Sequence, residues 1–566
     1  MQTNYSAKMF SKTIVTLAFF MLIDQGLIQS MDYNGNLIRK NKIVFNNKSS
    51  NSYIQSLTQK TINFDGLIDQ TFGSNTNLLG STYLANLPLS TSAQDPYEVA
   101  PFSAMALQSD GKIVIVGALY SPSLFVAARF LPNGQLDTTF GGYNGQIPGT
   151  VTIPAIAKTQ NENDYCYAIA IQPDGKIVMG GIAGLSSYLF AAVRLLPNGQ
   201  LDPSFNPNGQ NGATPGTMFI YNTFSNNGGI AGYDYDGCLS LAIQPNGNII
   251  MGGFSTQYIS TYTQYFSAAR LLPNGTLDTT FNPTGAGDTI PGTMYISQTI
   301  AGGTADVCYS LALQEDNTII MAGSSANNGN SNTYFAAARL LSDGSLDTSF
   351  NPTALNSQAG TVYITSNIGA EQNSDVCHSI IMQPDRKIVM GGSTENTTSY
   401  NPQFAAARLL SNGSLDSSFG GLISQPGTMY ITPNIAGYTY DICYSLQLQL
   451  DGKILMGGQA YANSLYTSYC FAAARLLSNG QLDTATFGGQ NGATPGTLWI
   501  PTILPDADGY DYSYTIALRP DGKIIMGGIS PDNNNNNYFA LVQLINPMSL
   551  VDYQASYASI GAGLYV

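Results

Sequence analysis

The sequence predicts an all-β fold built from repeats, and three observations support this prediction. The 566 residues include 59 Gly and 35 Tyr and are 43% hydrophobic but only 10% charged, which is too apolar for a disordered chain. Gly, Asn, Thr, Tyr, Ile and Val favour strands joined by tight turns rather than helices. One pattern also recurs with a period near 68 residues, and Asp-Gly or Asn-Gly pairs separate its apolar runs.

Each repeat unit contains four short apolar runs that we interpret as strands. A clear copy reads CYSLALQEDNTIIMAG from Cys308, YFAAARLLSDGSLDTSF from Tyr334 and GTVYI from Gly360. The turn between the first two runs recurs seven times, which defines units 1 to 7. Its Asp or Asn stands at Asp110, Asp174, Asn246, Asp316, Asp385, Asp451 and Asp521.

The turns between these runs predict the topology of each unit. PDGK or a variant lies between the first two runs, and LPNGxLD or a variant lies between the last two. Such turns between short β-type runs are strong hairpin signals, so each unit is predicted to be a four-stranded antiparallel meander. Seven meanders predict a seven-bladed β-propeller of four-stranded antiparallel blades. Small residues such as Gly180 and Gly181 would allow neighbouring blades to approach closely.

The same motifs resemble a known family, the bacterial delta-60 repeat proteins. Its units look like LQPDGKIVVGG followed by FALARLNPDGSLDTSFG, and this chain has IQPDGKIVMGG from Ile171 and FAAVRLLPNGQLDPSF from Phe190. The resemblance covers residues 61–566. It implies a propeller and no assigned reaction. The chain departs from the family pattern at Asn248 and Thr318, where the turn Lys is usual, and at Gln543, where Arg is usual.

The N-terminal 60 residues differ in charge from the rest of the chain. They hold seven Lys or Arg against two Asp, and Lys8 and Lys12 precede an apolar run over residues 14–23. That run is too short to span a bilayer and suits a signal-peptide core. We therefore expect a signal peptide or N-terminal anchor at 1–30, a linker at 31–60 and the propeller at 61–566. The protein is expected to be exported, as a secreted, cell-surface or periplasmic protein.

Either end of the chain could complete the last blade. FDGLIDQTFG from Phe64 looks like a spare turn between third and fourth strands that lacks its preceding strands. INPMSLVD from Ile545 and GLYV from Gly563 look like a degenerate copy of the same region. Closure by a terminal strand would remove an exposed sheet edge. The sequence leaves both possibilities open.

Six Arg residues in the predicted third strands are each followed eight residues later by an Asp. Fixed spacing across a tight turn predicts structural ion pairs rather than a catalytic ring of carboxylates. Unit 7 has Gln543 in place of Arg, with its Asp displaced to Asp552, so we expect this unit to fray first. The six pairs are Arg129 with Asp137, Arg194 with Asp202, Arg270 with Asp278, Arg339 with Asp347, Arg408 with Asp416, and Arg475 with Asp483.

The cysteines and the single histidine predict packing rather than chemistry. Five of the six Cys stand eight residues before the turn Asp or Asn, at what we interpret as a small buried position, and no CxxC pair suggests a metal cluster. Phe102 and Ser513 occupy this position in the other two units. His378 stands where other units have Tyr, which argues against a Ser-His-Asp triad.

A second recurring carboxylate lies two residues before the Cys position. One interpretation is a ring of candidate ligand residues at the mouth of the central channel, and the alternative is turn capping by local backbone N–H groups. The residues are Asp164, Asp236, Asp306, Asp375, Asp441 and Asp511. Asp506, Asp508 and Asp511 also form a weak Ca²⁺ candidate that lacks the EF-hand pattern. No other cofactor is expected.

The leading functional hypothesis is a binding platform for a protein or a glycan. After residue 60 the chain holds fourteen basic against thirty-three acidic residues, which disfavours nucleic-acid binding. In a meander the PDGK and LPNGxLD turns share one face, so the loops of variable length gather on the other, where binding usually resides. The alternatives are a metal-assisted hydrolase or lyase that uses the channel-mouth carboxylates, and a purely structural surface protein. No loop carries a catalytic signature, and we expect a monomer with no membrane domain beyond a possible N-terminal anchor.

Overall fold

The computed structural model describes strands at 27–31 and 37–42 and most of residues 66–545. Outside the description lie 76–77, 85–102, 120–122, 144–146, 158–162, 186, 221–234, 259–261, 286–288, 329–331, 354–356, 365–367, 369–373, 396–400, 422–424, 439, 462–467, 490–492, 502, 505–509 and 533–535, and all residues after 545. The chain divides into two compact regions, Met1–Asn63 and Phe64–Val566.

In the first region, β1 (Leu27–Met31) pairs antiparallel with β2 (Leu37–Lys42). These strands fall within the segments 1–30 and 31–60, for which we expected a leader and a linker. The other residues of those two segments lie outside the described residues. No helix in the described part of the chain is long and apolar enough to cross a membrane.

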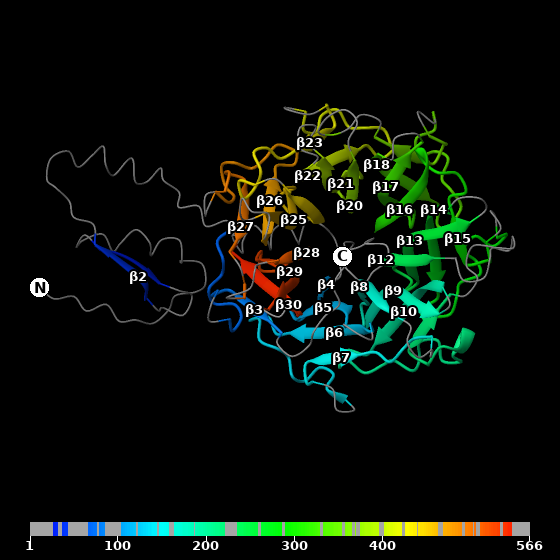
Figure 1. Cartoon of the computed structure of the whole chain (residues 1–566), viewed down its shortest axis with the longest axis horizontal. Coiled ribbons are helices and arrows are strands. Elements are labelled where there is room, and N and C mark those ends of the chain that lie inside the picture. Colours follow the sequence, from blue (N-terminus) through cyan, green and yellow to red (C-terminus); the bar gives the residue numbers. More distant parts are fainter. Residues whose placement is uncertain are drawn as a thin grey trace, which may run out of the picture. The chain divides into compact units, whose positions relative to one another are not determined.

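The second region is all-β, with strands where the repeat pattern predicts them (Figure 1). The first strands of units 1 to 7 are β4 (Ser103–Leu107), β8 (Tyr165–Ile171), β12 (Asp236–Ile243), β16 (Gly302–Leu313), β20 (Asp375–Met382), β24 (Ile442–Leu448) and β28 (Tyr512–Leu518). The second strands are β5 (Ile113–Ala118), β9 (Ile177–Leu185), β13 (Ile249–Tyr258), β17 (Ile319–Asn327), β21 (Ile388–Glu395), β25 (Ile454–Tyr461) and β29 (Ile524–Pro531).

The third strands are β6 (Phe125–Phe130), β10 (Ser187–Leu195), β14 (Tyr262–Leu271), β18 (Thr333–Leu340), β22 (Pro402–Leu409), β26 (Tyr469–Leu476) and β30 (Asn537–Leu544). The fourth strands of units 1 to 6 are short: β7 (Thr150–Thr152), β11 (Thr217–Phe219), β15 (Thr293–Tyr295), β19 (Thr361–Tyr363), β23 (Thr428–Tyr430) and β27 (Thr497–Ile500). A 3₁₀ turn, η4 (Gln210–Gly212), precedes β11.

Within units 1 to 6 the strands pair antiparallel in chain order, which is the predicted meander, and β28, β29 and β30 of unit 7 do the same. Units 3 and 4 form one eight-stranded sheet, because β14 also pairs in parallel with β16 where Gln264 lies opposite Ala305. Each first strand contacts the first strand of the next unit, and β28 contacts β4. The first strands are therefore the inner strands of the assembly.

The fourth strand of unit 7 comes from the beginning of the region. β3 (Ser81–Tyr83) pairs antiparallel with β30, and Ile68 forms a bridge with Leu544. The backbone N–H groups of Gly66 and Asp69 donate to the carbonyls of Ile545 and Gln543, both at 2.8 Å. Of the two closures that the sequence left open, the described residues therefore form the N-terminal one.

The hydrophobic core lies between neighbouring sheets. Val114 and Val116 of β5 pack with Cys166 and Met179 of unit 2 in one buried cluster. Each sheet thus buries one face against the preceding unit and the other against the following unit. The first Gly of the Gly-Gly pair is part of this packing, because a Cβ at Gly180 would lie 2.9 Å from the side chain of Leu241 in unit 3.

The second Gly is required by a bulge that the sequence analysis did not predict. In unit 4, Cys308 pairs with Gly323 and Ser310 with Ala322, so Tyr309 is left out of the ladder. A Cβ at Gly323 would lie 1.9 Å from the carbonyl oxygen of Val307. The ladder of β8, β12, β20, β24 and β28 shifts at the same position.

Unit 1 lacks this bulge, and its register corrects one expectation. β4 pairs without a shift, and Ser103 lies opposite Gly117. Ser103, and not Phe102, is therefore the equivalent of the cysteines. In the other units the bulged residue adds one position between the Cys position and the turn Asp or Asn, so the spacing of eight residues becomes seven in unit 1. All six cysteines are buried and free.

Candidate functional sites

The six Arg–Asp pairs are formed, each with the Arg Nε 2.6–3.0 Å from an Asp Oδ2. We call each pair, with its ring and hydrogen-bond partners, an arginine clamp. In unit 5, burial raises the pKa of Asp416, but hydrogen bonds from Ser418 and the charge of Arg408 outweigh this effect and lower the pKa to about 2. The guanidinium also lies over the ring of Phe419, 4.7 Å from its centroid.

The clamp also connects neighbouring units. Arg129 Nη1 donates to the carbonyl of Pro197 in unit 2 at 2.5 Å, and Arg194 Nη1 donates to the carbonyl of Pro273 in unit 3. The corresponding acceptors for Arg270, Arg339 and Arg408 are Ser342, Ser411 and Ser478. Sequence spacing indicated the ion pair, whereas the Phe and the carbonyl of the next unit were missed. The Phe had a signal, because the motif LDTSF and its variants place it three residues after the Asp in units 1 to 5 and four residues after it in unit 6.

Unit 7 has a clamp assembled from different parts. Arg519, which stands where other units have Gln, donates to the Pro132 carbonyl of unit 1 at 2.6 Å and to Gln543 Oε1 at 2.8 Å. Gln543 Nε2 and Lys523 Nζ each lie 2.7 Å from Asp69 Oδ2. Asp69 therefore supplies the carboxylate that we had assigned to Asp552, which lies outside the described residues. We expected unit 7 to be the least restrained because it lacks the clamp Arg. That reason no longer holds, because Arg519 stands at the Gln position and Gln543 at the Arg position, and together they form a clamp.

The six carboxylates proposed for a channel mouth are buried, each between 0 and 3% exposed. Five of them, all but Asp236, bind the loop that leads into their own unit. Asp306 Oδ2 accepts from the N–H of Ile300 at 2.7 Å, and Asp441 Oδ2 accepts from the N–H of Ile435 at 2.8 Å. Asp164, Asp375 and Asp511 accept from Ile156, Ile368 and Ile503 in the same way. This arrangement is the backbone-capping alternative, and it leaves these carboxylates little access to a ligand.

Burial raises the pKa of four of these carboxyls, to about 7 for Asp306, Asp375 and Asp441 and to about 6 for Asp511. The folded protein therefore holds protons that the unfolded chain releases near pH 4, and the stability these groups contribute is full below pH 4 and lost as the pH rises through about 7.

Between pH 6 and pH 8 the free energy of unfolding should fall by about 1 kcal/mol less in the Asp441→Asn variant than in the wild type. The variant lacks the carboxyl that ionises in this range, and one pKa unit is worth about 1.4 kcal/mol. Denaturant unfolding at the two pH values measures this difference. Asp137→Asn, whose carboxyl has a lowered pKa, is the control and should keep the wild-type difference. Equal pH dependence in wild type and Asp441→Asn would contradict the prediction.

The calcium candidate lies mostly outside the described residues. Asp506 and Asp508 are not described, and Asp511 is buried against Ile503. Among the residues that are described, no three His, Cys, Asp or Glu side chains gather in a metal-binding arrangement.

The bulged residues of the inner strands bring aromatic rings together. His378 lies 5.2 Å from the ring of Tyr309 and 5.0 Å from that of Tyr444, which lies 5.3 Å from Tyr514. Burial lowers the pKa of His378 to about 4, so the imidazole is neutral at physiological pH. His378 thus occupies a Tyr position in an aromatic packing layer.

A second group of rings lies at the variable-loop ends of units 6 and 7. We define the tyrosine cluster as Tyr440, Tyr461, Tyr469, Tyr510 and Tyr512, all half-buried. Tyr461 and Tyr469 stack with centroids 4.3 Å apart, and their hydroxyls are 2.9 Å apart. Tyr469 also contacts the other three rings at 5.1–5.8 Å. Burial and neighbouring hydroxyls raise the pKa of Tyr512 to about 12, so its hydroxyl stays neutral and can donate a hydrogen bond.

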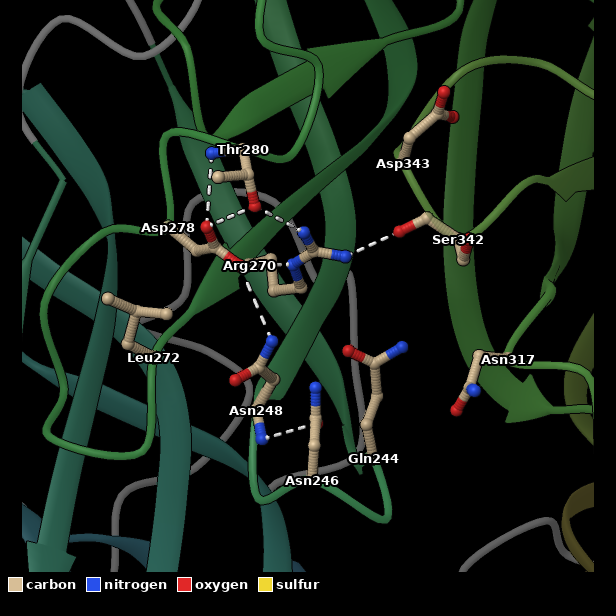
Figure 2. A pocket seen from close by; sticks show the side chains of 10 residues that line it. All are labelled: Gln244, Asn246, Asn248, Arg270, Leu272, Asp278, Thr280, Asn317, Ser342 and Asp343. Atoms are coloured by element: carbon tan, nitrogen blue, oxygen red, sulfur yellow. Dashed lines mark hydrogen bonds and ion pairs between the residues drawn. The ribbon is translucent and has the colours of Figure 1, made fainter.

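A pocket of about 590 Å³ opens on the opposite face, between the turns of units 3 and 4. Figure 2 shows Arg270 and Asp278 of the unit 3 clamp on one side and Ser342 and Asp343 of unit 4 on the other. Gln244 lies below the guanidinium. The sequence analysis did not single out this pocket, although the missing turn Lys at Asn248 was a visible signal.

The repeats match a known protein family. The family described as "Domain of unknown function (DUF5122) beta-propeller" matches residues 108–140, 172–205, 244–281, 314–350, 383–419 and 449–485. Six segments of the chain are thus similar to this family of propeller repeats. Five of the six matched segments begin at the Gln that stands two residues before the turn Asp or Asn, and they end at the Phe of the clamp. Each of these segments therefore consists largely of the second and third strands and the clamp residues. The comparison with curated proteins gave no match.

Solved structures that match this chain do so at low identity and with low TM-scores. A protein of unknown function from Dyadobacter fermentans is 10% identical, with a TM-score of 0.36, and the match covers 83% of this chain and 100% of that one. A polysaccharide lyase of family PL25, an ulvan lyase, is 9% identical, with a TM-score of 0.37 and coverage of 87% and 98%. The GH93 α-L-arabinofuranosidase of Fusarium graminearum is 9% identical, with a TM-score of 0.35 and coverage of 69% and 96%. These similarities carry no information about the activity of this chain.

Proposed function

We propose that this protein is an exported seven-bladed propeller that binds a protein or a glycan through its variable-loop face. Seven blades in a closed ring are supported by seven four-stranded units, by the contact of β28 with β4, and by the completion of unit 7 by β3. The basic start and the apolar run over residues 14–23 support export. Seven blades in averaged electron-microscopy projections are expected, and six or eight would refute this part of the proposal.

The tyrosine cluster is the observation that carries the binding proposal. Tyr combines a large apolar ring with a hydroxyl and has few rotatable bonds, so it provides contact area at low entropic cost. Loops rich in Tyr, Ser and Asn are typical of protein surfaces selected for binding. In this chain, half-buried Tyr rings lie at the strand ends that lead into such loops. On the opposite face, every turn between a first and a second strand has five residues, and the connections from the third to the fourth strands vary only between 18 and 21 residues.

We expect the Tyr461→Ala/Tyr510→Ala variant to bind its partner at least tenfold more weakly than the wild type. Aromatic side chains at the centre of an interface often contribute more than 1 kcal/mol each. A glycan array and a pull-down from the extracellular fraction of the native cell would identify the partner, and titration would measure the affinity.

Tyr143→Ala is the matched control and should bind like the wild type. Tyr143 is half-buried and lies after the clamp Phe of unit 1, on the face with the constant turns. Wild-type binding by the double variant would contradict the proposal, as would failure to find any saturable partner. The second result would favour the purely structural surface protein.

A further inference from the structure

The clamp carboxylate normally has a second cation beside it. In five units the turn Lys places its Nζ 2.7–3.8 Å from that carboxylate; these residues are Lys112, Lys176, Lys387, Lys453 and Lys523. Unit 3 has Asn248 at this position, and its Nδ2 lies 3.4 Å from Asp278 Oδ2. The place of one ammonium group is therefore taken by a shorter, neutral amide.

Two further residues, Asn246 and Asp343, change the net charge around the unit 3 clamp, and unit 2 provides the comparison. In unit 2, the cations Arg194 and Lys176 are balanced by Asp202 and Asp174, and the facing turn of the next unit has the neutral Asn274. In unit 3 the turn Asp is replaced by Asn246.

The facing turn of unit 4 also differs, because it has Asp343 where the other units have Asn. The N–H of Asn282 donates to the Asp343 carbonyl at 2.6 Å, which holds this turn against unit 3. Arg270 is thus left with two carboxylates, Asp278 and Asp343, around one pocket. The site has one negative charge in excess, which a monovalent cation would balance.

A buried acceptor in the pocket has no partner. Gln244 is 4% exposed, and its Oε1 accepts no hydrogen bond from the described residues. In units 1, 2 and 5 the equivalent Gln Oε1 accepts from the clamp Arg at 3.2–3.4 Å. Figure 2 shows Gln244 extending toward the space between Arg270 and Ser342. A buried oxygen without a donor is unfavourable, and a ligand with N–H groups would satisfy it.

We propose that this pocket binds a primary ammonium group, carried by an alkylamine or by a lysine side chain, where five other units hold their own lysine. An ammonium group at the place of the missing Lys offers N–H donors for the Gln244 amide oxygen and the Asp278 carboxylate, and Asp343 adds negative charge on the far wall of the pocket. The volume of about 590 Å³ exceeds what the ammonium needs, and Leu272 provides an apolar wall for its alkyl stem. The pocket lies at the opposite strand ends from the tyrosine cluster, so this inference is independent of the proposed function.

Unit 4 shows why the absence of Lys alone does not create such a site. It has Thr318 in place of Lys, and the Thr318 hydroxyl lies 2.6 Å from Gln314 Oε1 and 2.7 Å from Asp316 Oδ1. The facing turn of unit 5 has the neutral Asn412. Its acceptor is therefore satisfied within the chain, and this separates unit 4 from unit 3, because the carboxylates of Asp316 and Asp347 beside Arg339 give unit 4 the same excess of one negative charge.

An NMR titration of the full chain at low salt with 1,5-diaminopentane, and separately with a short peptide that contains one lysine, tests the proposal. We expect saturable binding with shifts confined to the turns of units 3 and 4. Asp343→Asn should weaken binding about tenfold, and Asn248→Lys should abolish it because the chain then fills the site itself. Asp385→Asn, which removes an exposed turn carboxylate in unit 5, should bind like the wild type. The tighter of the two ligands identifies the source of the ammonium.

Three results would overturn the proposal. They are the absence of saturable binding to either amine, equal binding by wild type and Asn248→Lys, and a site that takes K⁺ or Ca²⁺ in preference to both amines. A thermal shift by 1,5-diaminopentane in the wild type, absent in both pocket variants, provides a second readout that does not depend on spectral assignment.

Discussion

Replacing Arg475 with Met is expected to lower the free energy of unfolding by about 3–5 kcal/mol, because it leaves the buried Asp483 carboxylate with Lys453 Nζ, 3.8 Å away, as its remaining cation. The side chains of Arg475 and Asp483 are 1% and 3% exposed, and their Nε–Oδ2 distance is 3.0 Å. The variant also loses hydrogen bonds to Thr486 and the ring contact with Phe487. Met keeps much of the apolar stem, so lost packing contributes little to the effect. Urea denaturation measures the change.

Arg339→Met is the graded comparison for this prediction. Arg339 and Asp347 form the same pair but are 13% and 10% exposed. Water can solvate the Asp347 carboxylate more easily, so the loss should be about half as large. If Arg475→Met cost less than about 1 kcal/mol, or if the two variants were equally destabilised, the clamp would not be a buried structural ion pair.

Removal of residues 1–84 is expected to destabilise the protein more than any point substitution. The deletion removes β3 and exposes the edge of β30. It also removes Asp69, which leaves Lys523 and Gln543 without their acceptor. We expect hydrogen exchange to become fastest in unit 7 and the melting temperature to fall by ten degrees or more, an order-of-magnitude expectation for the loss of a whole strand.

Removal of residues 1–63 is the matched control for this deletion. It takes away the first compact region but leaves the clamp carboxylate Asp69 and strand β3 in place. The melting temperature should remain close to that of the full chain. If the two deletions were equally stable, closure by β3 would not be a source of stability.

The sequence was sufficient to predict the strands, because the period, the Gly-containing turns and the alternation of apolar runs are local signals. It also predicted the Arg–Asp pairs, since eight residues across one hairpin turn bring two side chains together. The bulge at Tyr309 could not be predicted, because it is specified by a carbonyl of one strand meeting a Gly of another. Only the pairing register, and no single strand, contains that information.

The closure of unit 7 was beyond sequence reasoning for a related reason. Gln543 looked like the loss of a clamp, and the exchange with Arg519 becomes visible only when the two strands are paired. Asp69 lies more than 400 positions away from its partners along the chain. The role of the six carboxylates that lie two residues before the Cys position was ambiguous for a different reason. A carboxylate repeated once per unit fits an exposed ring and a backbone cap equally well, and the Ile300 N–H beside Asp306 decides between them.

The direction of the clamps has a consequence for how such a chain can change in length. In the clamps of units 1 to 5 the guanidinium donates forward, to the turn carbonyl of the following unit, so units 2 to 6 present that carbonyl in the same place. A duplicated or deleted interior unit therefore leaves each donor facing an equivalent acceptor. The junction made by Arg519, Gln543 and Asp69 has its own parts, which no interior unit can replace. Duplication or loss of an interior unit is thus compatible with the clamps, whereas unit 7 needs the residues of its own junction.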